Sequence, residues 1–380
     1  MHNSVLVVGT GTIGEPLTGL LGTMAKELAI DEVIFYKHTP RRTDLPLVEG
    51  LLRKGAFIAA NKENHPKWKA MGIDVGYTFE EALSRTRVVA DCSTEGHGLE
   101  NKDKFYTSRT DKIKNFLAQG SEKGFGTPFV TGINNYILND DKKHQFIQVV
   151  SCNTHNITSV LKNLAFGKEG PKDAISNPSA KDGSVLEEAR FVALRRATDI
   201  SQNSDYLASP EVGTHKDLKY GSHHAQDAAK LYKTMGHELN LFSTAIKIPT
   251  QFMHVLFFDL KLKKGAELTR QEVMSRFRND PYVAITHKLQ AALVFSFGRE
   301  HGFYGRILDQ SVVVEPTVAV LNDKKDPDAP GREVVGYCFT PQDGNSLLSS
   351  TTAITQWMTG DTEEAQSRLK CLERYRFKEV

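Results

Sequence analysis

The chain has 380 residues and a formal charge of +2, with 39% hydrophobic and 25% charged residues. This length allows two domains with separate cores, and the composition is ordinary for a soluble globular enzyme. The near-neutral charge gives no reason to expect a nucleic-acid partner, and no apolar run approaches the length of a membrane span.

The cysteines are four in number and scattered, and none forms a Cys-x-x-Cys pair. This pattern argues against a disulfide framework and against a zinc site, so we predict no metal. The first residues enter a strand pattern directly, without a charged and then apolar leader. We therefore expect a reduced, cytoplasmic location.

A glycine-rich motif stands near the start of the chain. The apolar strand pattern Ser4–Val8 runs into Gly9-Thr10-Gly11-Thr12-Ile13-Gly14, and a helical pattern, Leu17–Leu28, follows. The first glycine permits a tight turn, the second lets the backbone approach a pyrophosphate, and the third allows close packing of helix on strand. The motif predicts a dinucleotide site at a helix N-terminus; the alternative is a glycine-rich turn without a ligand.

The end of the second predicted strand, Glu32–Tyr36, indicates which dinucleotide is preferred. An NAD site would carry a carboxylate there to hold the ribose 2′-OH. The chain instead has Lys37 with Arg41 and Arg42, and its first carboxylate is Asp44. We predict NADP as the cofactor, with NAD possible; a solvated basic loop is the alternative.

Strand and helix patterns alternate through the rest of the first 150 residues, which predicts a Rossmann-type, doubly wound α/β domain over residues 1–150. The expected elements are strands at Phe57–Ala60, Val75–Tyr77, Val88–Ser93, Phe116–Ala118 and Phe129–Gly132, and a helix at Phe79–Arg85.

A candidate nucleophile follows the next strand pattern, Phe146–Val150. The sequence Ser151-Cys152-Asn153-Thr154 comes directly after it, and a segment that can be helical, Ile157–Leu164, comes next. Unpaired N–H groups in the first turn of a helix favour a thiolate, which is the reactive form of cysteine. The alternative is a buried cysteine that acts as a small hydrophobe.

The second half predicts an α+β catalytic domain over residues 151–320, with a mixed or antiparallel sheet and helices on one face. Residues 321–380 read as strand and then helix, an ending that we expect to return to the nucleotide-binding domain. The expected elements are strands at Glu188–Arg196, Leu239–Ile248 and Val334–Phe339, and helices at Leu268–Phe277, Ala284–Val294 and Leu347–Met358.

Four histidines are candidate proton acceptors for Cys152. His223 and His224 stand in a polar segment, His254 in an apolar one, and His155 beside the cysteine itself. A buried, neutral imidazole can serve as the base for a thiol. The residue types alone leave the choice among the four open.

Several of these motifs together resemble the archaeal-type (class II) glyceraldehyde-3-phosphate dehydrogenases. The resembling pieces occur in the order of that family over roughly the first two-thirds of the chain. They are the run from Gly9 to Gly14, Lys37-His38-Thr39, Ser151-Cys152-Asn153-Thr154, Arg195-Arg196-Ala197-Thr198-Asp199, Ser222-His223-His224 with Asp227, and Pro249-Thr250 followed by Met253-His254.

The resemblance implies roles for single residues. Cys152 matches the nucleophile and His254 the catalytic histidine. The resemblance also implies a homotetramer that handles a small phosphorylated aldehyde and inorganic phosphate. Substrate positions are matched by Ser151, Asn153, His223 and His224, and nucleotide contacts by Thr12, Ile13, Lys37, Gly120 and Arg195 or Arg196.

The expected activity is phosphorylating oxidation of glyceraldehyde 3-phosphate with NAD(P), through a thioester on Cys152 and with His254 as general base. The chain differs from the family pattern at His155, at Ala225-Gln226 and at Leu256. These differences leave a related cysteine-dependent reductase of another semialdehyde as the alternative. A nucleotide-sensing regulator without catalysis is a third interpretation, against which the presence of both Cys152 and His254 argues.

Overall fold

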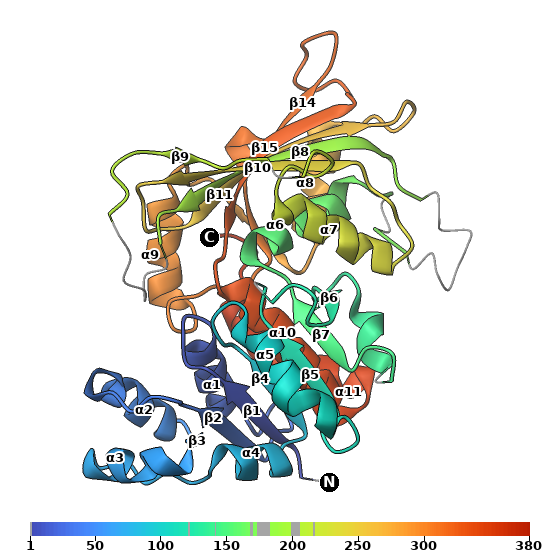
Figure 1. Ribbon diagram of the computed structural model, residues 1–380. Helices are drawn as coiled ribbons and strands as arrows, with labels where there is room; N and C mark the ends of the chain where they lie inside the picture. Colours follow the sequence, from blue (N-terminus) through green and yellow to red (C-terminus); the bar gives the residue numbers. More distant parts are fainter. Residues whose placement is uncertain are drawn as a thin grey trace. The chain divides into compact units, whose positions relative to one another are not determined.

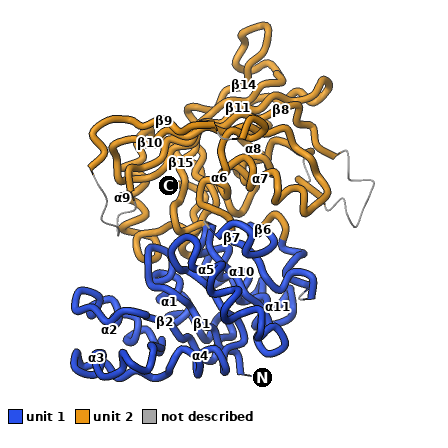
Figure 2. The backbone as a smooth tube through the Cα atoms, viewed as in Figure 1, with its two compact units in different colours: residues 1–131, 135–149, 346–373 blue, residues 132–134, 150–345, 374–380 orange. Residues whose placement is uncertain are grey.

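The computed structural model describes residues 2–120, 122–140, 142–167, 170–172, 183–198, 206–215 and 217–380. Asp199, in the motif that begins at Arg195, lies outside these ranges. Figure 2 shows two compact units. Unit 1 comprises residues 1–131, 135–149 and 346–373, and unit 2 comprises residues 132–134, 150–345 and 374–380.

Unit 1 contains a seven-stranded parallel sheet in the order β3-β2-β1-β4-β5-β7-β6. This confirms the predicted Rossmann-type, doubly wound fold. The strands are β1 (Ser4–Val8), β2 (Glu32–Tyr36), β3 (Ala56–Ala59), β4 (Val88–Asp91), β5 (Asn115–Ala118), β6 (Thr127–Phe129) and β7 (Phe146–Val149). The helices are α1 (Gly14–Thr23), α2 (Leu45–Leu52), α3 (His65–Ala70), α4 (Phe79–Arg85), α5 (His97–Asn101), α10 (Gly344–Thr359) and α11 (Thr362–Leu369).

The strands of unit 1 are mostly apolar because a parallel sheet is covered on both faces. All five residues of β1 are buried. Helix α1 begins at Gly14 and ends at Thr23, earlier at both ends than predicted, and Ala29 in the turn after it has a left-handed φ of 58°. The predicted strand at Val75–Tyr77 is wrong, because only an isolated bridge between Ala59 and Tyr77 forms there.

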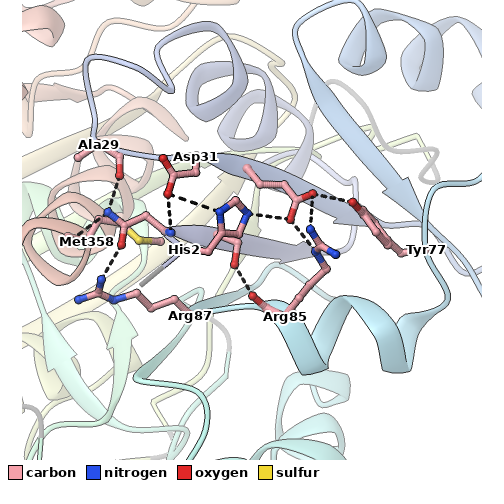
Figure 3. Close-up of polar contacts among 10 residues, drawn as sticks. His2, Ala29, Asp31, Tyr77, Arg85, Arg87 and Met358 are labelled. Carbon is pink, nitrogen blue, oxygen red and sulfur yellow. Dashed lines mark hydrogen bonds and ion pairs between the residues drawn. The ribbon is translucent and has the colours of Figure 1, made fainter.

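A polar cluster lies at the amino ends of β1 and β2 (Figure 3). The buried carboxylate of Glu32 accepts hydrogen bonds from Arg85 Nε at 2.8 Å and from the Tyr77 hydroxyl at 2.7 Å. Burial alone would raise the pKa of Glu32, but these hydrogen bonds outweigh it and lower the pKa. The cluster joins both ends of α4 to β2, at the strand ends remote from the glycine motif, so its role is structural.

Unit 2 is built on a mixed, eight-stranded sheet in the order β12-β13-β15-β11-β8-β10-β9, with β14 paired to β15. Helices α6, α7 and α8 lie along one face of it (Figure 1). This confirms the expected α+β architecture. The strands are β8 (Leu186–Arg196), β9 (Glu211–Val212), β10 (Leu241–Ile248), β11 (His254–Leu262), β12 (Val283–Thr286), β13 (Ser311–Val314), β14 (Ala319–Leu321) and β15 (Glu333–Thr340), and the helices are α6 (Cys152–Leu164), α7 (His223–Thr234), α8 (Arg270–Asn279) and α9 (Ala291–His301).

Two expectations for the second half need correction. The predicted helix at Ala284–Val294 is wrong: residues 283–286 form β12, which pairs in parallel with β13 and is fully buried, and α9 starts only at Ala291. The C-terminal segment 321–380 is also divided. Strand β15 pairs with β11 in the sheet of unit 2, and the chain enters unit 1 again only at Ser346.

Within the described part of the chain, no helix combines the length and the apolar character that crossing a membrane requires.

Candidate functional site

The glycine motif lies at the carboxyl ends of the parallel strands in unit 1. The order of strands reverses between β1 and β4, and this switch point is where open α/β sheets bind nucleotides. Gly9 has a φ of 92°, and a side chain on it would come within 2.8 Å of the Cys92 carbonyl oxygen. A side chain on Gly14 would lie 2.0 Å from the Gly9 carbonyl oxygen. Both positions therefore require glycine on steric grounds.

Gly11 differs from these two glycines. A side chain there would meet no described protein atom within 4 Å, so packing within the chain does not require glycine at this place. Ile13 is the N-cap of α1, and its carbonyl oxygen accepts the Leu17 N–H. Gly11, Thr12 and Ile13 thus lead into the N-terminus of a ten-residue helix, a position that suits a phosphate group.

Lys37 follows β2 at the same edge of the sheet, but it is already engaged. Its Nζ atom lies 2.9 Å from Asp44 Oδ2 and donates to Thr10 Oγ1 at 2.9 Å. Asp44, which the sequence placed beyond the strand end, therefore folds back onto the cation. Gly120 follows β5 at this edge as well, and its carbonyl oxygen accepts a hydrogen bond from Gln148 at 3.1 Å.

Cys152 is the first residue of helix α6 in unit 2. The helix starts there and not at Ile157, because Ser151 is its N-cap and accepts the Thr154 N–H at 3.4 Å. The side chain of Asn345 holds the Cys152 carbonyl oxygen at 3.0 Å. The thiol is thus placed at the N-terminal end of a 13-residue helix, where first-turn N–H groups favour the thiolate.

The other cysteines have different surroundings. Burial raises the pKa of Cys338 to about 12. Burial, with the Asp91 carboxylate nearby, raises the pKa of Cys92 still further. Cys92 and Cys152 are both half-buried, and of these three cysteines only Cys152 begins a helix. Its position therefore favours Cys152 as the reactive thiol over Cys338 and Cys92.

His254 is the first residue of β11 and is buried. Its Nδ1 atom accepts the backbone N–H of Arg196, the last residue of β8, at 2.9 Å. Its Nε2 atom lies 2.8 Å from the side-chain nitrogen of Gln342. Burial, together with the charges of Arg196 and the exposed Arg195, lowers the pKa of His254 well below its usual range. The imidazole is therefore uncharged at neutral pH.

A chain of hydrogen bonds joins the start of α6 to the strand that pairs with β11. Thr340, on β15, stands opposite His254 in the antiparallel register. Its hydroxyl donates to Asn153 Oδ1 at 3.2 Å and accepts from the side chain of Asn156 at 2.8 Å. Asn153 directly follows Cys152, so the fold brings the nucleophile candidate and His254 to the same edge of the sheet.

The paired histidines occupy the first turn of α7. Their rings lie 3.9 Å apart, and His224 is buried. The helix is fixed there because Ser243 Oγ accepts the Ala225 N–H at 3.0 Å. Ser243 is near the beginning of β10, whereas Arg196 stands opposite the end of that strand. His223 and His224 are therefore anchored some distance along the sheet from His254.

His155 has a structural position on α6. Its Nδ1 atom lies 3.0 Å from the Ser151 carbonyl oxygen, and its side chain is fully buried. Burial lowers its pKa from 6.5 to about 4, although hydrogen bonds to the backbone of Ser151 and Val150 oppose the change. The ring therefore ties down the residues that present Cys152.

This buried ring predicts a loss of stability in mild acid. Between pH 6.5 and about 4 the unfolded chain binds a proton at His155 and the folded chain does not, so the free energy of unfolding falls as the pH falls through this range. The full effect is about 3 kcal/mol. Urea unfolding of a His155→Gln variant should show a flatter pH dependence than the wild type. His301→Gln, on the exposed end of α9, is the control; equal slopes in all three proteins would contradict the prediction.

The sequence did not predict three residues of this arrangement, Thr340, Gln342 and Asn345. Their hydrogen bonds to Asn153, His254 and Cys152 join residues 88 or more positions apart, so only the folded structure could reveal them. Among the described residues no group of three or more His, Cys, Asp or Glu side chains could hold a metal ion.

Comparison with known proteins identifies similar chains but no matching family model. A glyceraldehyde-3-phosphate dehydrogenase of Archaeoglobus fulgidus is 25% identical over 305 residues, which is 79% of each chain. One of Pyrobaculum islandicum is 25% identical over 322 residues, or 83% of this chain and 81% of the relative. One of Aeropyrum pernix is 27% identical over 281 residues, or 73% and 71%. These similarities confirm the resemblance predicted from the motifs.

Proposed function

We propose that this chain, an enzyme similar to archaeal glyceraldehyde-3-phosphate dehydrogenases, oxidises glyceraldehyde 3-phosphate to 1,3-bisphosphoglycerate with NAD(P) and inorganic phosphate. The observation that carries the proposal is the placement of Cys152. It begins a helix whose next residue, Asn153, is hydrogen-bonded to the strand partner of His254. A helix N-terminus favours the thiolate, which is the nucleophilic form of cysteine, and an uncharged imidazole can take up a proton.

In the proposed reaction the Cys152 sulfur attacks the aldehyde carbon to form a hemithioacetal, and His254 takes up the proton that is released. Bound NAD(P) supplies the hydride acceptor. Oxidation of the hemithioacetal leaves a thioester on Cys152. Inorganic phosphate attacks the thioester carbonyl, the carbon–sulfur bond breaks, and the acyl phosphate leaves with the thiolate restored. Covalent catalysis divides one difficult oxidation into two easier steps.

The substrate-binding residues in this proposal are Ser151, Asn153, His223 and His224. Ser151 and Asn153 precede and follow Cys152 in the chain at the start of α6, and the histidine pair lies at the start of α7. That separation suits a substrate whose phosphate is several bonds away from its aldehyde. Arg195, exposed at the end of β8, is a cation available to an anionic ligand.

The test is an assay of the purified chain with glyceraldehyde 3-phosphate, phosphate and each nicotinamide cofactor, followed by the absorbance of reduced nicotinamide. We expect turnover that depends on inorganic phosphate. Oxidation of a different phosphorylated or carboxylated semialdehyde, without oxidation of glyceraldehyde 3-phosphate, would favour the alternative reductase. Absence of oxidation with all of these aldehydes would reject the proposed activity.

The cofactor proposal is a preference for NADP that depends on Lys37 and is restrained by Asp44. A 2′-phosphate would have to share Lys37 with the Asp44 carboxylate, which lies 2.9 Å from it. A charge-assisted hydrogen bond to phosphate contributes about 1.5–3 kcal/mol. Lys37→Ala should therefore lower kcat/KM for NADP by about tenfold or more and leave that for NAD nearly unchanged.

Asp44→Asn should act in the opposite direction, because it frees Lys37 for the phosphate and removes a repelling charge. We expect a severalfold rise in the ratio of NADP to NAD kcat/KM, which shrinks with added salt. Glu49→Gln on α2, paired with Arg53 on the surface, is the matched control. Equal changes for both cofactors in the Lys37 and Asp44 variants would indicate a solvated basic loop without a role in selection.

The assembly proposal is a homotetramer, supported by an apolar face on the sheet of unit 2. Helices α6, α7 and α8 lie along one face of that sheet (Figure 1). The ring of Phe258 on β11 lies 6.3 Å from that of Phe277 on α8, and Leu256 and Phe258 are both fully buried. The opposite face exposes part of its apolar side chains, and such patches favour association with a second copy.

Light scattering of the purified chain should show an oligomer, and a Phe257→Lys variant should show smaller species; a monomeric wild type would contradict the proposed homotetramer. The open face carries Val192, Leu194, Ile246, Phe257 and Tyr337, whereas the neighbouring Val255 packs against the buried cluster that includes Val294 and Phe339.

A further inference from the structure

Two hydrogen-bond donors face the ring of His254, one at each nitrogen. The backbone N–H of Arg196 points at Nδ1 at 2.9 Å. The side chain of Gln342 makes two contacts: its oxygen accepts the backbone N–H of His254 at 2.9 Å, and its nitrogen lies 2.8 Å from Nε2. A backbone N–H can only donate, so the Gln342 oxygen must face it. The NH₂ group of Gln342 is therefore directed at the ring.

These donors act against protonation of the imidazole. A neutral ring has one N–H and one lone pair, so it can accept one of the two donors. A protonated ring has two N–H groups and no lone pair, so both of its N–H groups would face donors. Gln342 is buried with the ring, and water has little access to relieve the conflict.

The charged groups around this end of the sheet either disfavour a positive charge on the His254 ring, as the two hydrogen-bond donors do, or form ion pairs with other residues. Arg195 and Arg196 stand on β8 and oppose a positive charge on the ring. Asp343 follows Gln342, and its carboxylate lies 3.5 Å from Arg306. The Cys152 thiol is on α6, one residue before the Asn153 side chain that contacts Thr340.

We propose that Gln342 is a positioning residue whose amide, together with the Arg196 N–H, holds the imidazole of His254 uncharged. This inference rests on the proposed function only for the role of that uncharged ring as general base. The state of the ring itself can be measured without any substrate. Of the two donors, the Arg196 N–H belongs to a strand backbone, and only the Gln342 side chain can be changed by substitution.

The test replaces the Gln342 amide, which donates to the ring, by a carboxylate of the same shape, which can only accept. In Gln342→Glu a carboxylate oxygen would accept a proton from Nε2 and favour the charged ring. We expect the titration midpoint of His254 to rise by about 1–3 pH units. Gln342→Met removes the donor without adding charge and should raise the midpoint by less. The readout is the NMR titration of full-length protein labelled at histidine carbons, with His254→Asn to assign the signal.

Kinetics give the second readout. In Gln342→Glu the acidic limb of the kcat/KM profile should move to higher pH, whereas a purely structural role would lower kcat/KM at every pH alike. Gln356→Glu, at another buried glutamine in unit 1, is the control and should leave the midpoint of His254 at the wild-type value. If Gln342→Glu does not fold, the Met variant decides.

The outcomes separate this inference from the proposed activity. A raised midpoint in a chain that does not oxidise glyceraldehyde 3-phosphate would support the role of Gln342 and reject the activity. A chain that oxidises this aldehyde, but whose His254 midpoint is the same in the wild type and the folded Gln342 variants, would overturn the role of Gln342 and leave the activity standing.

Discussion

A Cys152→Ser variant is expected to lose at least about 10³-fold in the rate of aldehyde oxidation while it binds NAD(P) as tightly as the wild type. The first turn of α6 can stabilise a thiolate near neutral pH, but a serine hydroxyl ionises far above the range that one helix terminus can offset. The two side chains have nearly the same shape, so the N-cap at Ser151 and the contact from Asn345 should remain.

The measurement is steady-state oxidation of glyceraldehyde 3-phosphate together with fluorescence titration of the cofactor. Cys371→Ser provides the control, because Cys371 is also only partly buried but lies in unit 1. It should retain wild-type rates. Substantial turnover by the Cys152 variant would exclude a thioester intermediate on this residue.

A His254→Ala variant is expected to lose about 10²–10⁴-fold in kcat/KM, the usual effect of removing a general base. His223→Ala, at the start of α7, should mainly raise KM. The contrast follows from position: His254 lies on the sheet edge that α6 reaches through Asn153 and Thr340, whereas the paired histidines are anchored near the start of β10.

Measurement of kcat and KM across a pH series for the His254→Ala and His223→Ala variants tests these roles of the two histidines. The exposed His301 on α9 supplies a neutral comparison as His301→Ala. A large fall in kcat for His223→Ala, with only a rise in KM for His254→Ala, would reverse the assigned roles of the two histidines.

The sequence predicted the nucleotide-binding fold well because its signals are local. Glu32–Tyr36 and Phe79–Arg85 were predicted with the bounds that the structure has, since an apolar strand run and a helical pattern each depend on neighbouring residues. Residues 283–286 were misassigned for the same reason. Four buried, mostly β-branched positions fit a strand or part of a helix, and the pairing with β13 that decides between them is remote in sequence.

The candidate site was predicted less completely. Residue type pointed to Cys152 and to four histidines, and the family resemblance singled out His254, but neither could show that this histidine shares an edge of the sheet with the thiol. That relation depends on the pairing of His254 with Thr340 and on the hydrogen bond between Thr340 and Asn153. Lys37 shows the converse, because its sequence context indicated a free cation and the fold gave it Asp44 as a partner.

The division of unit 1 along the chain has a consequence for how the protein can be made. Helix α10 supplies Ser350, which accepts a hydrogen bond from Gln119 at 2.9 Å, and Ser349, which accepts the Thr131 N–H at 3.2 Å. These residues are translated only after the whole of residues 150–345. A nascent chain that extends only to the end of β7 therefore lacks helix α10, which belongs to the core of unit 1. Completion of unit 1 during synthesis must therefore wait until residues 150–345 of unit 2 have been translated.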